Sequence, residues 1–425
     1  MIDRRPAAIA RCTGPADVVA AVRFSAEQNV FPAIRGGGHN VAGLAMVDDG
    51  FVIDLQPMKA ITVDVEARTA TAQTGLTWGE FDAETQRHGL ATTGGVISAT
   101  GISGLTLGGG IGWLMGRYGL TCDNTLAYEV VLANGDLVRA SAEEHPDLFW
   151  ALKGGGGNFG VVTSITYRLH PVTTVLSGML LHPIANAHEA VRFYRDFLAA
   201  GVPDELVVYL AALTTPDGIP VIAFVPTYCG DDLDEGERII EPLRKFGPPI
   251  ADLVGRMPYI ALQQMLDGAA PFGLRSYWKS TFLRALPDEA IDAWIQFAEA
   301  RSSPRSFTIF EPSHGAVSRV AADATAVSLR GYPFDLVILS LWEDASDDAS
   351  NIEWTRQFFS AMQPWAADTV YVNGLDHDDA ARIPDAYGRN FARLCEVKTR
   401  YDHGNRFRRN QNIQPIGQAA GQQGA

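Results

Sequence analysis

The sequence is poor in the residues and segments that mark metal sites, disulfide frameworks and membrane spans. Only four of its 425 residues are cysteine, and they are scattered without a Cys-x-x-Cys pair or a Cys/His cluster. This spacing argues against a structural zinc site and a disulfide-stapled fold. No apolar run reaches the roughly 18 residues of a membrane-spanning helix, and the first residues, MIDRRPAAIARC, lack the apolar core of a signal peptide. We therefore expect a cytoplasmic protein with no metal and no membrane partner.

Basic residues are also in the minority. The chain has 34 Lys and Arg against 49 Asp and Glu, a net charge of −15, which disfavours nucleic acid and anionic membranes as main partners. The sequence contains no Walker A, HExxH or GxSxG motif and no internal repeat of 20–50 residues. We expect a small-molecule substrate and a monomer or homodimer.

The chain is long enough for two domains, and its character changes near residue 172. Residues 1–172 predict alternating strands and helices, including a helix that begins at Pro15, one strand over 63–72, and a hairpin at Asn134-Gly135. Residues 173–384 alternate strand-like and helical runs, which is typical of an α+β domain. Residues 385–425 form a separate C-terminal segment whose tail is low in complexity.

Glycine is the residue that stands out, with 42 copies gathered in runs. The runs lie at residues 36–38, 94–119 and 154–160. Glycine is entropically costly in a folded chain, so this density needs a reason. One reason is that successive backbone N–H groups can face a single anion and form a nest for phosphate; the alternative is a set of tight turns at strand ends. Three runs within about 130 residues favour a cofactor that carries a pyrophosphate.

One glycine pattern is misleading. Gly155, Gly157 and Gly160 match G-x-G-x-x-G, but a dinucleotide fingerprint requires a strand before the glycines and a helix after them. Here a predicted helix precedes and a predicted strand follows, which excludes a Rossmann site.

His39 directly follows three glycines at the end of a short strand. A histidine beside a turn is by itself most often a surface or capping residue. Its interpretation depends on the motifs elsewhere in the chain.

Five motifs together resemble the berberine-bridge-enzyme-like family of FAD-linked oxidases. They are RGGGHNVAG (35–43), TGISGLTLGGGIGWLMGRYGLTCDN (100–124), GGGGNFGVVT (154–163), YVN (371–373), and YGRNFARLCEVKTRYD with NRFRRNQNI (387–413). They occur in the family's order over nearly the whole chain. The resemblance implies an α+β fold with a PCMH-type (vanillyl-alcohol-oxidase) FAD-binding domain. Two α/β subdomains, from residues 1–172 and 385–425, would enclose FAD, and residues 173–384 would form a substrate domain with an antiparallel sheet covered by helices.

The resemblance also implies that FAD is bound covalently through His39. Many members add a second bond from a cysteine, but the aligned position here is Ile97, and Cys122 is expected to be a core or near-flavin thiol. His39 is therefore expected to be the only covalent link. Further contacts to FAD carry over from the family's motifs, residue by residue. They are Arg35, Gly36, Gly37, Gly38, His39, Asn40, Gly43, Gly94, Gly95, Ser98, Thr100, Gly101, Gly104, Gly108, Gly109, Ile111, Gly160, Val161, Val162 and Asn412.

The family's chemistry is hydride transfer from a substrate C–H to the flavin, with a base that removes a proton from the neighbouring O–H or N–H. Tyr387 is the expected base. It shares one face of a predicted C-terminal helix with Asn390 and Leu394, by their i, i+3, i+7 spacing. On this face Leu394 is expected to anchor the helix, and Tyr387 and Asn390 are expected to point into the cleft as catalytic residues. Tyr371 and Asn373 are the second candidates.

Other positions shape the expected substrate site. A tyrosine base needs a nearby cation, for which Arg330 and Lys279 are candidates. Tyr277 and Trp278 form either an aromatic wall or part of the core. Gly374, where members often have an aromatic residue, is expected to open space. Members usually carry a further segment before the equivalent of Met1.

Thr100 is expected beside the reactive edge of the flavin, where a small side chain admits O₂. This favours an oxidase that releases H₂O₂. The alternatives are a dehydrogenase of the same fold with another electron acceptor, and an inactive small-molecule-binding relative. Alcohols, sugars, amines and secondary metabolites remain open as substrates, because the fold does not choose among them.

Overall fold

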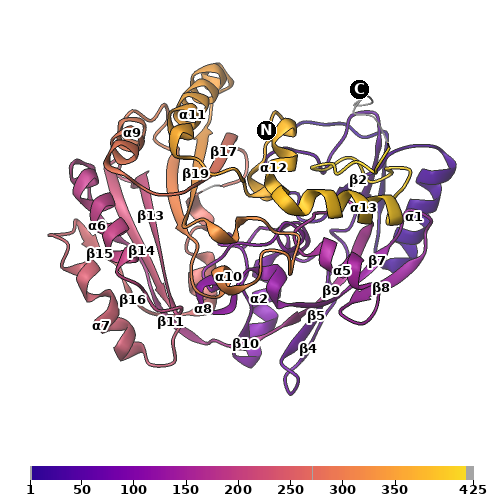
Figure 1. The fold of residues 1–425 in the computed structure, drawn as a ribbon, viewed down its shortest axis with the longest axis horizontal. Coiled ribbons are helices and arrows are strands. Elements are labelled where there is room, and N and C mark those ends of the chain that lie inside the picture. The colour runs from indigo at the N-terminus through magenta and orange to yellow at the C-terminus, as the bar shows by residue number, and fades with distance from the viewer. Residues whose placement is uncertain (1, 270, 418–425) are drawn as a thin grey trace.

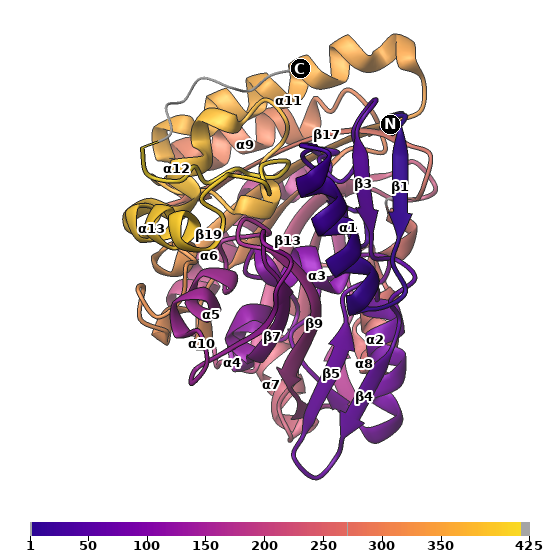
Figure 2. The ribbon, with the colours of Figure 1, turned by 90° about the vertical axis from the view of Figure 1, so that its right-hand side faces the viewer.

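In the computed structural model, which describes residues 2–269 and 271–417, two groups of sheets stand side by side (Figure 1). The N-terminal residues and the last helices build one group, and the middle of the chain builds the other (Figure 2). The predicted α+β class is confirmed. The domain boundaries at residues 172 and 384 stay a prediction.

A small parallel sheet begins the first group. Its strands, in spatial order, are β1 (Ala8–Arg11), β3 (Phe51–Asp54) and β2 (Ala33–Arg35). Helix α1 (Pro15–Glu27) starts at Pro15 as predicted, because proline's fixed φ suits the first helical turn. All four residues of β3 are buried, and β3 pairs with the short strand β2. This pairing positions the glycine run that follows β2.

A five-stranded antiparallel sheet follows. Its spatial order is β4 (Ile61–Asp64), β5 (Thr69–Gln73), β9 (Val161–Arg168), β7 (Thr125–Val131) and β8 (Leu137–Ser141). The hairpin at Asn134-Gly135 is confirmed, with Gly135 at φ +84°. The single strand predicted over 63–72 is wrong: the chain turns back at Arg68, at φ +52°, and β4 pairs with β5.

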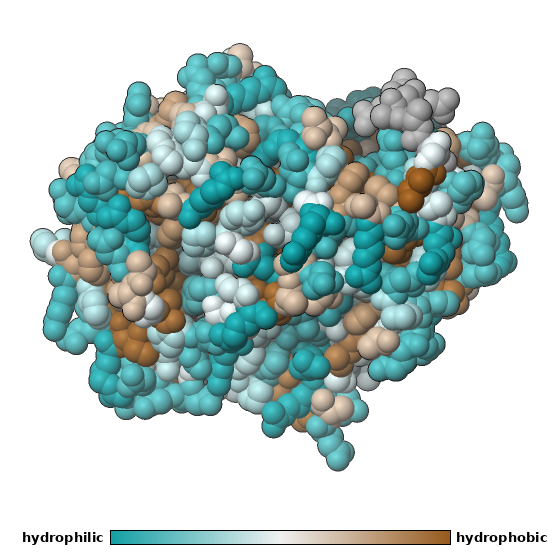
Figure 3. Space-filling model, viewed as in Figure 1, coloured by the Kyte–Doolittle hydropathy of each residue, from teal (hydrophilic) through white to brown (hydrophobic). Residues whose placement is uncertain are grey.

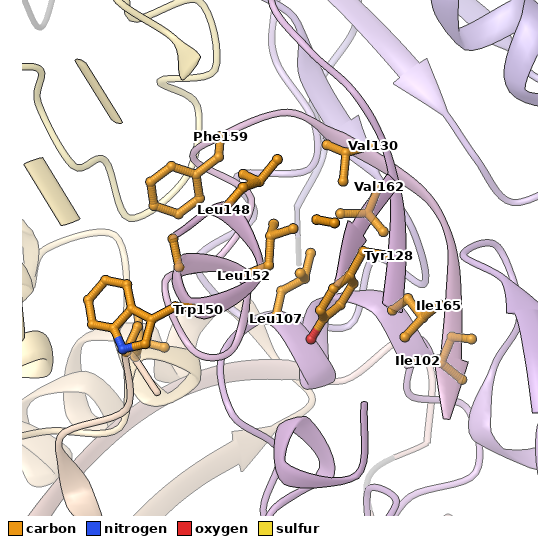
Figure 4. Close-up of a cluster of buried hydrophobic side chains, with 14 of the residues drawn as sticks. Ile102, Leu107, Tyr128, Val130, Leu148, Trp150, Leu152, Phe159, Val162 and Ile165 are labelled. Carbon is orange, nitrogen blue, oxygen red and sulfur yellow. The ribbon is translucent and has the colours of Figure 1, made fainter. Parts of the chain in front are cut away.

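Helices beside this sheet enclose the first hydrophobic core. They are α2 (Trp78–Thr85), α3 (Ile102–Leu107) and α5 (Pro146–Leu152), whereas α4 (Met115–Tyr118) belongs to a separate cluster that includes residues of the second group. Figure 4 shows Leu107 of α3 and Leu152 of α5 packed with Tyr128 and Val162 of the sheet. Two short strands, β6 (Leu90–Ala91) and β10 (His170–Pro171), pair before the chain enters the second group.

The second group is one large antiparallel sheet. Its main order is β15 (Ala251–Asp252), β12 (Leu180–Pro183), β14 (Pro220–Tyr228), β13 (Leu206–Thr214), β18 (Phe307–Pro312), β19 (Phe334–Trp342) and β17 (Arg275–Leu283). Strand β11 (Thr174–Ser177) pairs with both β14 and β16 (Gly255–Pro258).

Alternation along these strands separates two faces. Leu210 of β13 and Leu336 of β19 pack toward the helices that cover the outer face, whereas Ala211 and Val337 point toward the first group of sheets. The covering helices are α6 (Ala187–Ala199), α7 (Leu233–Arg244), α9 (Asp288–Glu299) and α11 (Asp348–Met362) (Figure 1). Two shorter helices, α8 (Tyr259–Gln264) and α10 (Ala316–Arg319), lie where the two groups meet.

The C-terminal segment returns to the first group. The predicted continuous helix is wrong, because Gly388, at φ +48°, separates α12 (Ile383–Tyr387) from α13 (Phe391–Tyr401). Helix α13 packs against α5 (Figure 1). Its buried Lys398 donates hydrogen bonds to the carboxylate of Asp402 and to the carbonyl oxygen of Asn158, which ties the segment to the third glycine run.

Hydrophilic side chains cover most of the face shown in Figure 3, and the apolar ones form separate patches. Among the described helices, none is both long and apolar enough to cross a membrane.

Candidate active site

A cavity of about 1150 Å³ lies between the two groups of sheets. Glycine runs and the loop after β2 line it on one side, and the inner face of the large sheet lines it on the other. Its size suits a dinucleotide together with a small substrate, since typical ligand pockets measure about 300–1,000 Å³.

The first two glycine runs touch each other at the cavity. A Cβ atom added to Gly37 would lie 2.5 Å from the Cα and N atoms of Gly101, so two backbones meet where no side chain fits. The third run reaches the same place, because the N–H of Gly156 donates a 2.9 Å hydrogen bond to the carbonyl oxygen of Leu107 at the end of α3. The three runs therefore form one backbone-lined wall, as a pyrophosphate nest requires.

His39 lies on the cavity lining just after Gly38, whose φ of +68° turns the chain. The side chain is half-buried, and burial lowers the pKa of the imidazole. The neighbouring Asn40 donates a 3.0 Å hydrogen bond to the carbonyl oxygen of Asn373, which holds this loop against the C-terminal part of the chain.

Most of the predicted FAD-binding residues line this cavity. They are Gly36, Gly37, Gly38, His39, Asn40, Gly95, Thr100, Gly101, Gly104, Ile111, Gly160, Val161 and Val162. The remaining ones lie outside the lining. They are Arg35, Gly43, Gly94, Ser98, Gly108, Gly109 and Asn412.

Several of these outer residues shape the wall from behind. A Cβ atom on Gly94 would lie 2.6 Å from the Trp78 ring, and one on Gly108 would overlap the Asn373 amide. The backbone N–H of Ser98 donates a 2.8 Å hydrogen bond to the carboxylate of Asp267, and the Ser98 hydroxyl donates a second one. Packing accounts for glycine at positions 94 and 108, and the contact of these residues with FAD stays a prediction.

At the C-terminal edge of the cavity, the lining residues precede the predicted one, Asn412. Arg409, Asn410 and Gln411 line the cavity, whereas Asn412 lies next to them with its buried Oδ1 atom unpartnered among the described residues. The NQNI motif marked the right segment, but not which side chains face inward.

Ile97 lines the cavity at the position where a second covalent link would need cysteine. Cys122 is fully buried in the core outside the lining, and burial raises the pKa of its thiol to about 12. Its expected role as a core thiol fits this position.

Tyr371 faces the cavity beside the second glycine run. Its hydroxyl oxygen accepts hydrogen bonds from the N–H groups of Gly110 (3.0 Å) and Ile111 (3.4 Å) and from the side-chain amide of Asn373 (2.9 Å). Burial is the largest influence and raises the pKa of Tyr371 above its ordinary value, and these three donors offset part of that rise. A neutral phenol oxygen has two lone pairs, so three donors complement a phenolate better than a phenol.

Tyr387 and Asn390 do not face the cavity, which contradicts the predicted orientation. Tyr387 is buried in the first core, its hydroxyl without a described partner, and burial raises its pKa. The Asn390 amide donates to the carbonyl oxygens of Ala322 and Thr325. The break at Gly388 is the reason, since it removes the common helical face that the spacing implied.

The predicted cations are held elsewhere. Arg330 forms an ion pair with Asp123 at 2.6 Å, and Lys279 pairs with Asp379 at 2.7 Å. Neither lines the cavity. Both therefore are structural ion pairs, and the expectation that one of them sits beside the base is wrong.

Because side chains alternate along β17, Tyr277 and Trp278 lie on opposite faces of the sheet. Trp278 of β17 lines the cavity, whereas Tyr277 points to the other face and donates a 2.6 Å hydrogen bond to Asp378. Gly374 also lines the cavity, but a Cβ atom there would overlap the Ser280 hydroxyl. Gly374 thus permits a close approach to β17 and does not open space.

Sequence reasoning missed two carboxyl groups on the lining. Glu311 of β18 and Asp335 of β19 are directly opposite each other in the antiparallel register. Burial raises the pKa of Glu311 to about 7, and burial with the negative charge of Glu311 raises the pKa of Asp335. Strand periodicity could have placed both on one face, but the pairing of β18 with β19 was not readable from the sequence.

The residues present fit FAD. The wall formed by Gly36, Gly37 and Gly101 offers backbone to a pyrophosphate, Val161 and Val162 offer an apolar surface for an adenosine half, and His39 lies on the same lining. The fold and the site thus define a flavin-binding enzyme.

Comparisons with known proteins agree. A family described as "FAD binding domain" matches residues 6–141, and one described as "Berberine and berberine like" matches residues 370–414. The chain is 32% identical to an FAD-linked oxidoreductase of Dictyostelium discoideum (94% of this chain, 87% of that one) and 28% identical to (R)-6-hydroxynicotine oxidase of Paenarthrobacter nicotinovorans (97% and 92%). The crystal structure of 6-hydroxy-D-nicotine oxidase from Arthrobacter nicotinovorans superposes with a TM-score of 0.87 at 27% identity (96% and 92%).

The chain belongs to the berberine-bridge-enzyme-like family of FAD-linked oxidases, and it is an FAD-linked oxidoreductase. The predicted PCMH-type fold is confirmed.

Proposed function

We propose that this protein is an oxidase that carries FAD covalently through His39 and oxidises a C–H bond next to an O–H or N–H in a small organic substrate, with release of H₂O₂. The single observation that carries this proposal is the cavity between the glycine wall and the inner sheet face, with His39 on its lining. One side of the cavity suits a cofactor, and the other suits an apolar substrate.

His39 is suited to a covalent link in two ways. Burial lowers the pKa of the imidazole, so a neutral ring with a free nitrogen lone pair dominates at neutral pH. His39 also lies on the same cavity lining as Gly37 and Gly101, where the cofactor would be held. With Ile97 on the lining in place of a cysteine, His39 is the one expected tether.

When bound, FAD supplies a hydride acceptor, and the protein has to orient the substrate and move its proton. Tyr371 is the base that the geometry favours over Tyr387. Tyr371 lines the cavity, and the Gly110, Ile111 and Asn373 N–H groups would stabilise a phenolate at its oxygen. The substrate O–H or N–H would give its proton to this oxygen.

Thr100, a small residue on the lining, leaves room for O₂, and the relatives named 6-hydroxynicotine oxidase support an oxidase. The test is the reaction of the reduced holoenzyme with air. Dithionite-reduced protein should regain its flavin absorbance within seconds in air-saturated buffer and form one H₂O₂ per flavin. Protein that stays reduced for minutes would instead be a dehydrogenase.

A further inference from the structure

The inner face of the large sheet carries two acidic side chains in an otherwise apolar surface. Glu311 follows Phe307 and Ile309 on the cavity side of β18, and Asp335 precedes Val337 and Leu339 on the cavity side of β19. Residues directly opposite in an antiparallel pair have Cβ atoms about 4.5–5.5 Å apart, so the two carboxyl groups are close neighbours.

Asp335 lacks the partners that buried acids normally have. Its side chain is 1% exposed, and neither carboxyl oxygen has a hydrogen-bond partner among the described residues. Arg382, the cation whose charge acts on Asp335, is instead held by Asp379 at 3.4 Å and by the carbonyl oxygen of Ser280 at 3.2 Å. An unpartnered buried carboxyl group is unfavourable unless something compensates it.

A third polar group faces the same place. The Ser280 hydroxyl of β17 is 2% exposed, lines the cavity, and has no described hydrogen-bond partner. Ser280 is directly opposite Val337, which follows Asp335 by two residues in β19. The two acids and the hydroxyl thus present several acceptor oxygens to the cavity.

We propose that Glu311 and Asp335 bind a positively charged nitrogen, so that the substrate of this enzyme is an apolar amine. Two ionised acids directly opposite each other on a sheet repel, which favours their protonated forms, and a cation between them favours the ionised forms instead. Ammonium N–H donors also satisfy the oxygens that the protein leaves open. An alcohol or a sugar would bring hydroxyl groups but no compensating charge.

The same site acts on Tyr371. The negative charge of Glu311 is one of the influences that raise the pKa of Tyr371. A substrate cation beside Glu311 would offset that charge and favour the phenolate. This supplies the nearby cation that Arg330 and Lys279, each in an ion pair elsewhere, do not supply.

The proposal rests on the proposed function only in taking the cavity as the substrate site. Binding, rather than turnover, is therefore the test. The FAD-loaded enzyme is titrated calorimetrically without O₂ with 2-phenylethylamine, which is protonated at pH 7, and with 2-phenylethanol, its neutral analogue. We expect the amine to bind roughly tenfold or more tightly, as a charge-assisted hydrogen bond implies.

Asp335→Asn and Glu311→Gln keep the side-chain shape and remove the charge, and each should reduce the preference to about twofold or less. Asp344→Asn makes the same exchange in an exposed residue just beyond β19 and should leave the preference unchanged. Melting temperatures at least as high as that of the wild type show that the variants fold. Equal binding of the two probes by the wild type, or a preference that survives both neutral variants, would overturn the proposal. A retained preference in a protein whose flavin does not react with O₂ would support the amine site and refute the oxidase.

Discussion

Asp82 is a buried carboxyl group at the contact between the two groups of sheets, and its protonation state can be tested. It lies in α2 with no exposed surface, and its Oδ2 atom accepts a 2.8 Å hydrogen bond from Gln263 of α8, across the contact. Its Oδ1 atom and the Oε1 atom of Gln263 have no described partners. Burial raises the pKa of Asp82 from its ordinary 3.8 to about 7. The folded protein therefore keeps Asp82 protonated to a higher pH than the unfolded chain does.

The sign of the pH effect follows from this difference. Because the folded-state pKa is the higher one, stability from Asp82 is fully present below pH 4 and is lost as the pH rises through about 7. The interval from 3.8 to about 7 corresponds to about 4 kcal/mol, at about 1.4 kcal/mol per pKa unit. Asp82→Asn removes the titration, and the new amide can donate to Gln263 Oε1. The variant should be more stable than the wild type at pH 8, by up to about 4 kcal/mol, and nearly equal to it at pH 4.

Thermal denaturation followed by circular dichroism at several pH values between 4 and 8 measures this effect. The gap in melting temperature between Asp82→Asn and the wild type should open as the pH rises. Glu66→Gln, in the exposed turn between β4 and β5, is the control and should show no such gap. Parallel curves for Asp82→Asn and the wild type would refute the buried, protonated state of Asp82.

Three further predictions concern the cavity. Gly37→Ala should lose FAD and destabilise the fold by about 1–3 kcal/mol, because its Cβ atom would lie 2.5 Å from Gly101. Flavin content per protein and the melting temperature measure this effect, and Gly255→Ala, which has open space around it, is the control. Retained flavin in Gly37→Ala would contradict the glycine wall. Tyr371→Phe should slow anaerobic flavin reduction by substrate about 100-fold or more with little change in substrate affinity, and an unchanged rate would remove Tyr371 as the base. Thr100→Leu should slow reoxidation by O₂ in a stopped-flow experiment without altering reduction by substrate, and equal reoxidation rates would show that Thr100 does not control access.

Much of the cofactor side was predictable because its signals are local. The glycine runs, His39 and the strand-then-glycine order depend on neighbours in the chain, and the three runs do meet at one cavity. The hairpin at Asn134-Gly135 and the helix at Pro15 depend on local turn and capping chemistry in the same way.

The substrate side was less predictable because it depends on pairing between distant strands. Glu311 and Asp335 become neighbours only when β18 pairs with β19, and Tyr371 gains its donors only when residues 110–111 fold against it. Tyr387 was misplaced because a glycine tolerated by the helical pattern, Gly388, adopts a positive φ and breaks the helix. The packing that keeps Gly94 and Gly108 behind the lining is likewise a tertiary effect.

A peptide map of the purified, acid-denatured protein tests most directly whether FAD is bound covalently through His39. We expect the flavin to stay with the precipitated chain and the peptide containing His39 to carry the mass of FAD. His39→Ala should release all flavin on precipitation. The wild type should show no second attachment site, because Ile97 lies where a second link would need cysteine. Flavin that passes entirely into the supernatant of the wild-type protein, or that is found on a different residue, would show that His39 is not the attachment site.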